Sequence, residues 1–205
     1  MRFDLEDWHS RHIPNWQVWL APYINVTSSA LEIGSCEGRS ALWLVDNILT
    51  GPCSDLLCVD PFSDEGFEGS DITHTGSKAN QTYLNFCENV KPYTVNPEPH
   101  QYNGKVNLCR NTSHSALRGC YAESYQFDII YIDGSHLCRD VLEDIVLAWP
   151  LLKQGGTLIL DDYQWHSSTG KPLDEPRMAI DCFLAIYARE YELLGKGVQA
   201  AVRKR

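Results

Sequence analysis

Five short apolar segments limit what this chain can fold into more than any other feature of its sequence. Each has the length of a β-strand and is separated from the next by helical or polar sequence; the segments are residues 30–33, 56–59, 106–109, 129–132 and 157–160. Several are apolar throughout instead of alternating, which is typical of strands buried on both faces of a parallel sheet. The pattern predicts an α/β domain with a Rossmann-like, doubly wound and mostly parallel sheet.

Helical periodicity fills several of the intervals between these segments. Residues 39–49 place their apolar side chains on one face, and Gly51 and Pro52 end that helix. After the fourth segment, an apolar stripe covers residues 137–149. We expect Ser135 to cap this helix and Pro150 to end it.

The C-terminal part of the chain is predicted to add one helix and one hairpin. Gly155 and Gly156 are expected to turn the chain into the fifth strand, and Pro176 suits the first turn of a last helix that continues to Arg189. Residues 191–194 and 198–202 have the pattern of two strands joined by a glycine turn. They predict an antiparallel hairpin, which brings the sheet to seven strands.

A single domain is expected for all 205 residues, because a chain of this length can bury one sizeable core. Residues 1–27 are predicted to form an N-terminal helical cap, in which tryptophans 8, 16 and 19 pack over the sheet. Residues 62–78 and 163–175 follow the carboxyl ends of strands and fit neither strand nor helix periodicity. They are candidate lid loops over a ligand site, with irregular surface loops as the alternative.

Charge and composition exclude several classes of protein. Lysine and arginine number 17 against 27 aspartates and glutamates, and the net charge of −10 disfavours nucleic acid as a partner. No apolar run approaches the roughly 20 residues of a membrane span, and the acidic start of the chain argues against a signal peptide. We therefore expect a cytoplasmic protein without membrane contact. The 8 cysteines form no C-x-x-C pair, which predicts buried free thiols and neither a zinc site nor a disulfide framework.

The first apolar segment ends in a turn with the spacing of a ligand-binding loop. Gly34 and Gly38 form a G-x-x-x-G turn that opens a helix, and glycine at both positions allows a ligand to approach the backbone. Cys36 stands where the G-x-G-x-x-G motif of dinucleotide sites has its middle glycine, so we expect a ligand without a pyrophosphate. An ordinary tight turn is the alternative.

A carboxylate follows the second segment. Asp60 stands where doubly wound nucleoside sites place an acid that accepts hydrogen bonds from ribose hydroxyls. Together with the glycine turn, Asp60 predicts a nucleoside pocket. A carboxylate that only caps the next loop is the alternative.

These motifs occur in one order along residues 28–205, together with F-D-I-I-Y-I-D-G-S-H at 127–136 and G-G-T-L-I-L-D-D-Y at 155–163. In this combination the chain resembles class I S-adenosylmethionine-dependent methyltransferases. L-E-I-G-S-x-E-G-R-S with I-D-G-S-H is similar to the branch of the macrolide-sugar O-methyltransferases, with a more distant likeness to the catechol type.

The resemblance implies a role for several residues at the cofactor. Those expected to line the methionine end and the sulfonium are Glu32, Gly34, Ser35 and Gly38, with Asp133 also at the cofactor. Asp60 would bind the ribose, and Ser113 would contact the adenine. Asn111 and Thr112 replace the Gly-Asp that usually precedes this serine in the family.

Three carboxylates follow the fourth and fifth segments, namely Asp133, Asp161 and Asp162. Neighbouring strands would bring them together, and clustered acids repel one another unless they are protonated or neutralised. A hard divalent cation with oxygen ligands, Mg²⁺ first, would neutralise them. In the enzymes that the chain resembles, such a trio holds a metal that binds the substrate hydroxyl. The alternative is that Asp161 caps the following turn and Asp162 is solvated.

His136 follows Asp133 by one helical turn, so its ring could point over the same crevice. A histidine pKa near 6.5 suits a general base at neutral pH. The resemblance implies that His136 removes the proton of the acceptor hydroxyl, with Asp133 as the second catalytic residue. A hydrogen-bonded structural histidine is the alternative.

The predicted function is thus methyl transfer to the hydroxyl of a small molecule, assisted by Mg²⁺. Tyr163, Trp165 and His166 are expected to face the acceptor, whose identity the sequence does not specify. Two other readings stay open: a nicotinamide-dependent oxidoreductase on a similar fold, which the missing middle glycine opposes, and a cofactor-binding module without catalysis. Paired edge strands or the N-terminal tryptophans could form a homodimer.

Overall fold

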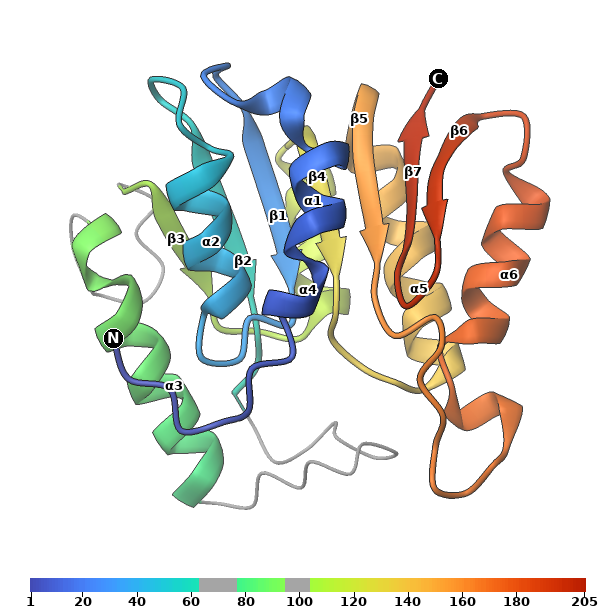
Figure 1. The fold of residues 1–205 in the computed structure, drawn as a ribbon, viewed down its shortest axis with the longest axis horizontal. Helices are drawn as coiled ribbons and strands as arrows, with labels where there is room; N and C mark the ends of the chain where they lie inside the picture. Colours follow the sequence, from blue (N-terminus) through green and yellow to red (C-terminus); the bar gives the residue numbers. More distant parts are fainter. Residues whose placement is uncertain (63–76, 95–103) are drawn as a thin grey trace.

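The computed structural model describes residues 1–62, 77–94 and 104–205, with only the backbone of residues 77–79. In this part of the chain, the strands form one sheet in the order β3-β2-β1-β4-β5-β7-β6 (Figure 1). Strands β1 to β5 pair in parallel, and β7 is antiparallel to both β5 and β6. The strands are β1 Ser29–Ile33, β2 Asp55–Val59, β3 Val106–Cys109, β4 Phe127–Ile132, β5 Leu152–Leu160, β6 Tyr191–Lys196 and β7 Ala200–Lys204.

Helices cover both faces of this sheet. Helices α1, α2 and α3 lie on one face, and α4, α5 and α6 on the other (Figure 1). The helices are α1 Ile13–Trp19, α2 Arg39–Asn47, α3 Ser77–Val90, α4 Ser113–Ala122, α5 Cys138–Ala148 and α6 Arg177–Ile186. Short 3₁₀ turns are η1 Ser10–His12, η2 Ala21–Tyr23, η3 Lys91–Tyr93, η4 Trp149–Leu151 and η5 Pro172–Asp174.

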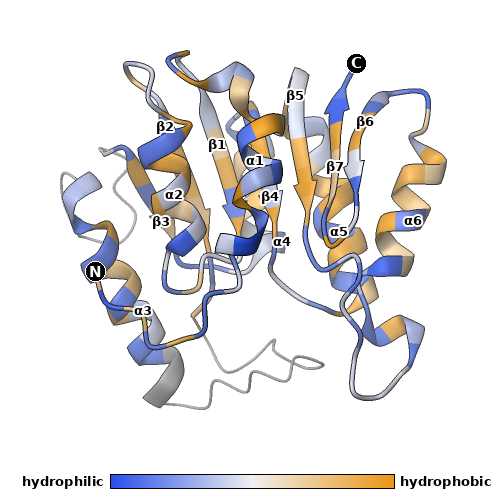
Figure 2. Ribbon diagram, viewed as in Figure 1, coloured by the Kyte–Doolittle hydropathy of each residue, from blue (hydrophilic) through white to orange (hydrophobic). Residues whose placement is uncertain are grey.

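The two faces bury separate hydrophobic cores, which explains why the central strands are apolar at consecutive positions. In β1, Leu31 and Ile33 pack with α4, α5 and α6, whereas Ala30 packs with α1 and α2. Side chains alternate between the faces of a sheet, so burial of both faces requires apolar residues in succession. Figure 2 shows this as hydrophobic colouring along the strands and on the sides of the helices that face them.

The predicted fold class is confirmed, and all five apolar segments are strands. Strand β5 differs from the prediction because it begins at Leu152, before Gly155 and Gly156. Its register against β4 changes from Phe127↔Leu152 to Ile129↔Thr157, so the extra residues bulge out of the ladder. The glycines therefore form an irregularity inside the strand and not a turn into it, and Gly155 has a φ of +78°.

The predicted cap of α5 is wrong. The helix begins at Cys138, and the Ser135 hydroxyl instead accepts a hydrogen bond from the Leu137 amide (3.1 Å) and donates one to Asp140 (2.8 Å). Ser135 thus orders the loop before the helix. At the other end, α5 passes at Ala148 into the η4 turn, which contains Pro150.

The other predicted boundaries differ from the structure by a few residues. Helix α6 ends at Ile186, before the predicted Arg189. The hairpin turn follows Lys196, since β6 continues through the predicted glycine turn to that residue. Of the candidate lids, 62–78 lies almost entirely outside the described residues. Residues 163–175 form an irregular segment in which Glu175 accepts a hydrogen bond from the Ser167 amide (3.2 Å).

Helix α1 packs through two of the three N-terminal tryptophans. Trp16 is fully buried and contacts the Tyr131 ring edge-on at 4.7 Å between centroids, and Trp19 is also buried. Trp8 is 38% exposed and lies outside this core. In the described ranges, no helix is long and apolar enough to cross a membrane.

The cysteines are all free thiols, as predicted, but not all of them are buried. Cys58, Cys120 and Cys138 lie in the core, whereas Cys53 and Cys182 are exposed. Cys53 lies in the loop before β2, and Cys182 lies on the outer side of α6.

Candidate active site

A cavity of about 700 Å³ opens at the carboxyl ends of the parallel strands. The residues that follow β1, β2, β4 and β5 all contribute to its wall, namely Gly34, Asp60, Asp133 and Asp161. This is the edge at which doubly wound sheets bind their ligands. The start of α4, part of α5 and the N-terminal residues complete the wall.

The glycine turn is shaped by neighbouring protein atoms. Gly34 has a φ of +84°, and a Cβ at this position would overlap the carbonyl oxygen of Asp133. Gly38 also has a φ of +84°, and its Cβ would lie 3.2 Å from the Phe86 ring. Gly34 lines the cavity, together with Ser35 and Cys36, but Gly38 does not. Packing therefore requires glycine at position 34, and the left-handed backbone conformation favours glycine at position 38, whatever ligand the cavity holds.

Glu32 lies beneath the cavity and not in its wall. Its fully buried carboxyl accepts hydrogen bonds from the Ser40 hydroxyl (2.5 Å) and the Cys58 thiol (3.5 Å). Burial raises the pKa of Glu32 to about 7. Ser40, its hydrogen-bond partner, lines the cavity, and the contact of Glu32 with the methionine end of a cofactor stays a prediction.

Asp60 connects the ends of β1 and β2. Its carboxylate accepts hydrogen bonds from the backbone amides of Ser35 (3.0 Å), Cys36 (2.9 Å) and Phe62 (2.8 Å). Asp60 therefore caps the neighbouring loops, as the alternative interpretation proposed. Asp60 also lines the cavity, so ribose binding stays a prediction.

Ser113 is the first residue of α4 and lines the cavity beside Asp144. Asp144 comes from α5, is only 3% exposed, and is not among the residues predicted from the sequence. Burial raises its pKa to about 7, and a hydrogen bond with the Ser113 side chain opposes that rise. The sequence signal that could have indicated this residue is the position of Asp144 next to Ile145, within the apolar stripe of the predicted helix.

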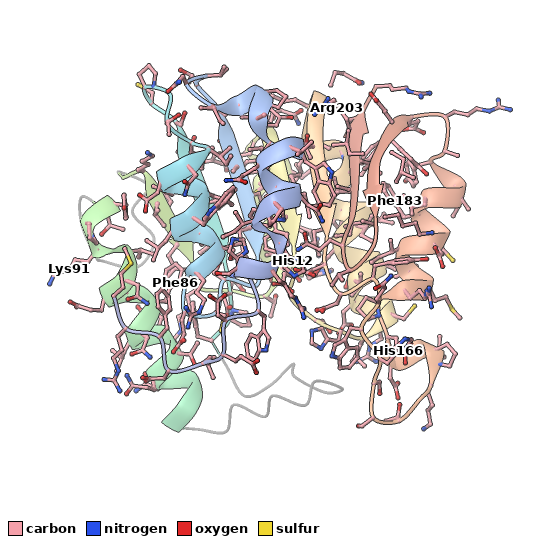
Figure 3. The ribbon with its side chains drawn as sticks, viewed as in Figure 1. His12, Phe86, Lys91, His166, Phe183 and Arg203 are labelled. Atoms are coloured by element: carbon pink, nitrogen blue, oxygen red, sulfur yellow. The ribbon has the colours of Figure 1, made fainter. Side chains whose placement is uncertain are left out.

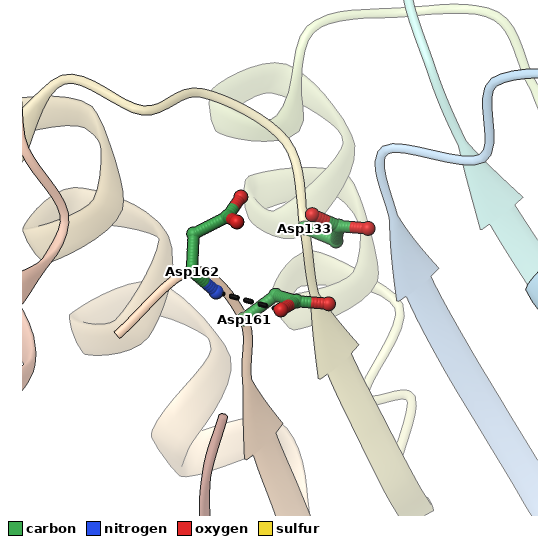
Figure 4. Close-up of side chains that lie close together, drawn as sticks. All are labelled: Asp133, Asp161 and Asp162. Atoms are coloured by element: carbon green, nitrogen blue, oxygen red, sulfur yellow. Dashed lines mark hydrogen bonds between the residues drawn. The ribbon is translucent and has the colours of Figure 1, made fainter. Parts of the chain in front are cut away.

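The structure brings together the three predicted metal ligands, Asp133, Asp161 and Asp162 (Figure 4). One carboxylate oxygen of each lies within 4.8 Å of the others. Desolvation is the main cause that raises the pKa values of Asp133 and Asp161, and repulsion within the trio adds to it. Three oxygen donors that destabilise one another in this way fit a hard divalent cation such as Mg²⁺.

Residues from distant parts of the chain surround Asp161. The Tyr131 hydroxyl lies within hydrogen-bond distance of both Asp133 and Asp161, and Gln199 donates a hydrogen bond to Asp161 (2.7 Å). The Trp16 indole in turn donates to Gln199 (2.8 Å). Asp161 also accepts a hydrogen bond from the Asp162 amide (2.6 Å), as the capping alternative proposed.

His12 approaches the same carboxylate from the N-terminal segment, below α1 (Figure 3). It is buried, and its Nε2 atom lies 3.9 Å from Asp161 Oδ1 and accepts a hydrogen bond from Arg11 (3.1 Å). Desolvation lowers the pKa of His12. No local sequence pattern indicated His12 or Gln199, because only the tertiary fold brings them to the strand ends.

His136 lies beside the trio, as predicted. Its Nε2 atom is 2.8 Å from Asp162 Oδ2, and its ring packs on Trp165 with 4.3 Å between centroids. The Nδ1 atom is buried without a hydrogen-bond partner among the described residues. Asp162 adopts a φ of +56°, a left-handed conformation that aspartate tolerates better than most residues.

Of the three residues expected to face an acceptor, only Trp165 lines the cavity. Tyr163 is buried elsewhere, where its hydroxyl donates a hydrogen bond to Asp181 (3.1 Å). His166 is exposed on the 163–175 segment and pairs with Glu175 (3.2 Å; Figure 3). Successive residues of this segment point in different directions, which explains why the aromatic run does not form one surface.

This sheet, with its acid cluster and cavity at the carboxyl edge, has the architecture of the Rossmann-like methyltransferases. Residues 31–163 match a protein family described as Methyltransferase domain. The chain belongs to this family. A search among curated proteins finds no match.

Solved structures share the fold at low sequence identity. A protein from Corynebacterium glutamicum is 17% identical, with a TM-score of 0.60 over 95% of this chain and 81% of that one. An O-methyltransferase from Bacillus cereus in complex with SAH is 18% identical, with a TM-score of 0.56 over 100% and 84%. MycE methyltransferase from the mycinamycin pathway, in complex with Mg and SAH, is 16% identical, with a TM-score of 0.60. The match covers 98% of this chain but 51% of MycE.

Proposed function

We propose that this protein transfers a methyl group from S-adenosylmethionine to a hydroxyl of a small molecule, with Mg²⁺ bound at the acid trio. The observation that carries the proposal is the placement of His136 beside Asp162 in the wall of a cavity that Asp133 and Asp161 also line. Family membership supports methyl transfer. The Mg and SAH of the MycE complex support the choice of metal and cofactor.

The cavity suits a nucleoside-containing cofactor together with a small acceptor. Its volume of about 700 Å³ falls within the range of roughly 300–1,000 Å³ that is usual for small-molecule sites. Ser35 and Cys36 would face the methionine end, Asp60 the ribose, and Ser113 with Asp144 the adenine. Bound S-adenosylmethionine would supply an electrophilic methyl group on its sulfonium.

Asp133, Asp161 and Asp162 would hold the metal. Mg²⁺ bound there would polarise the acceptor hydroxyl and lower its pKa. Tyr131 and Gln199 fix Asp161 by hydrogen bonds, so that its carboxylate keeps one orientation in the cavity wall. An acceptor oxygen at the trio would lie on the same side of the cavity as His136.

His136 would take the proton of the acceptor hydroxyl. Asp162 lies 2.8 Å from the Nε2 atom and holds the ring beside the trio. Trp165 holds the ring from one side. The deprotonated acceptor oxygen would be placed to take the methyl group, and S-adenosylmethionine would supply that group and become SAH.

Isothermal titration with SAH and thermal unfolding, each in the presence and absence of Mg²⁺, test the binding part of this proposal. We expect wild type to bind SAH, to gain thermal stability with Mg²⁺, and to lose that gain in Asp162→Asn. Asp46→Asn is the matched control, because Asp46 is an exposed acid outside the cavity. Binding of NAD and not of SAH would contradict the proposal and support an oxidoreductase.

Methyl transfer itself is tested with a panel of polyol, sugar and catechol acceptors. We expect turnover by wild type and its loss in His136→Ala with SAH binding retained. Turnover that survives both Asp162→Asn and a chelator would refute the role of the metal. SAH binding without transfer to any acceptor would favour a non-catalytic binding module.

A further inference from the structure

The first residues of the chain form a strap across the carboxyl edge of the sheet. This N-terminal strap, residues 2–12, passes from α3 below α2 to the start of α1 (Figure 1). It is attached to the turn that follows β1, through Glu37. The Glu37 carboxylate accepts hydrogen bonds from the backbone amides of Asp4 (3.1 Å) and Leu5 (3.0 Å).

Glu37 is only 3% exposed, although it lies on a surface turn. Its third donor is the side-chain amide of Asn85 on α3, which donates to Oε1 at 2.7 Å and also to the Asp4 carboxylate at 3.0 Å. All three donors to Glu37 are uncharged. A buried carboxylate with such partners depends on keeping each of these hydrogen bonds, because each compensates for lost hydration.

Further contacts hold the strap to the same elements. Asn89 accepts a hydrogen bond from the Arg2 amide (2.6 Å) and donates to the carbonyl oxygens of Arg2 (2.8 Å) and Glu37 (3.0 Å). Arg39, the first residue of α2, donates to the Leu5 carbonyl (2.9 Å) and stacks on Phe3 at 4.0 Å. The strap is thus an ordered part of the fold and not a loose terminus.

The strap supplies part of the cavity wall, next to the turn that anchors it. Leu5, Glu6 and Trp8 of the strap line the cavity, as do Ser35, Cys36 and Glu37 itself on the turn. The Glu37 carboxylate therefore joins two parts of the wall of the same site.

We propose that Glu37 is a positioning residue for cofactor binding, which holds the N-terminal strap against the turn after β1 so that the cavity closes around the cofactor. The inference rests on the proposed function, since it takes the ligand of this cavity to be S-adenosylmethionine. By linkage, a cofactor that contacts both parts of the wall stabilises the strap, and an anchored strap tightens cofactor binding.

The test compares wild type with Glu37→Gln in hydrogen–deuterium exchange and in SAH titration. Gln keeps the shape of Glu37 but has one oxygen and no charge, so it cannot accept from Asn85 and from both strap amides together, and the hydrogen bonds that remain are weaker. We expect the amides of Asp4 and Leu5 to exchange about tenfold faster, and the SAH dissociation constant to rise about tenfold. Bound SAH should slow exchange of the strap in wild type.

Two further variants separate this role from general damage to the fold. Glu123→Gln, at an exposed position after α4, is the matched control and should leave both readouts unchanged. Asn85→Ala removes one donor to Glu37 and should give the same effects at smaller size. The gain in thermal stability with Mg²⁺ should persist in Glu37→Gln, because the acid trio is intact.

The results distinguish failure of the Glu37 anchor from failure of the proposed function. If wild type fails to bind SAH, the proposed function fails, while exchange at Asp4 and Leu5 still tests the anchor. If wild type binds SAH and Glu37→Gln loosens the strap without a change in SAH affinity beyond twofold, the positioning role is refuted and the function stands. Unchanged strap exchange in Glu37→Gln would refute the anchor itself.

Discussion

Replacement of Glu32 by glutamine should make the protein more resistant to alkaline conditions. Glu32 is fully buried on β1, and burial raises its pKa from the ordinary 4.5 to about 7. Between these values the unfolded chain has released a proton that the native protein keeps. The favourable contribution of neutral Glu32 is therefore complete below pH 4.5 and is lost as the pH rises through 7.

The size of this effect follows from the two pKa values. At about 1.4 kcal/mol for each pH unit between them, ionisation of Glu32 costs roughly 3 kcal/mol of stability once the pH is well above 7. The same linkage gives a cost of roughly 1 kcal/mol at pH 5.5. Glu32→Gln carries no charge and can still accept a hydrogen bond from Ser40, so it escapes this cost.

The measurement is urea unfolding followed by tryptophan fluorescence at several pH values from 5.5 to 8.5. We expect the free energy of unfolding of Glu32→Gln, relative to wild type, to increase by about 2 kcal/mol across this range. Subtraction of wild type removes the contributions of all other titrating groups. Glu192→Gln, at an exposed position on β6, is the matched control and should show no such trend.

A relative stability of Glu32→Gln that stays constant with pH, within about 0.5 kcal/mol, would refute this reasoning. It would mean that Glu32 titrates alike in the folded and unfolded chain. The buried site would then be hydrated or rearranged around the charge.

Three further predictions concern packing, a hydrogen-bond chain and a second buried acid. Gly34→Ala should lose roughly 3 kcal/mol or more of unfolding free energy in urea, because its Cβ would overlap the Asp133 carbonyl oxygen. Gly170→Ala is the control and should lose only about 1 kcal/mol, because Gly170 has a φ of +63° but no atom within 4 Å of a Cβ. Trp16→Phe leaves the acceptor of buried Gln199 unpaired and should cost about 1–3 kcal/mol; a loss no larger than that of a neutral surface variant would count against it. Asp144→Asn should gain about 2 kcal/mol relative to wild type between pH 5.5 and 8.5, since burial raises the pKa of Asp144 to about 7. A flat profile for Asp144→Asn would show that this carboxyl is hydrated in the cavity.

Local patterns were sufficient to predict the central strands and the positions at which they end. A strand buried on both faces needs consecutive apolar residues, and a side chain that follows it must lie at the carboxyl edge. Asp60, Asp133 and Asp161 could therefore be assigned to one edge before any contact was known. His136 followed from its spacing to Asp133.

Local patterns were insufficient wherever a partner distant in the sequence determines the conformation. Ser135 has the chemistry of a helix cap, but Asp140 and the Leu137 amide take its hydroxyl and the helix starts later. Glu32 follows the family pattern, yet its side chain lies on the face of β1 that packs under Ser40. Alternation along a strand predicts that a residue points to one of two faces, and not which side chains it meets there.

The sequence by itself determined the strands, their parallel arrangement and the set of acids at one edge, because hydrophobic periodicity and the order of the strands along the chain are properties of the sequence. Only the tertiary structure decided what each acid does there. Asp60 holds a turn, Glu37 holds the N-terminal strap, and Asp161 is held by Gln199 from the far end of the chain. Hydrogen bonds and desolvation depend on neighbours brought together by folding, and these neighbours differ among carboxylates that look alike in the sequence.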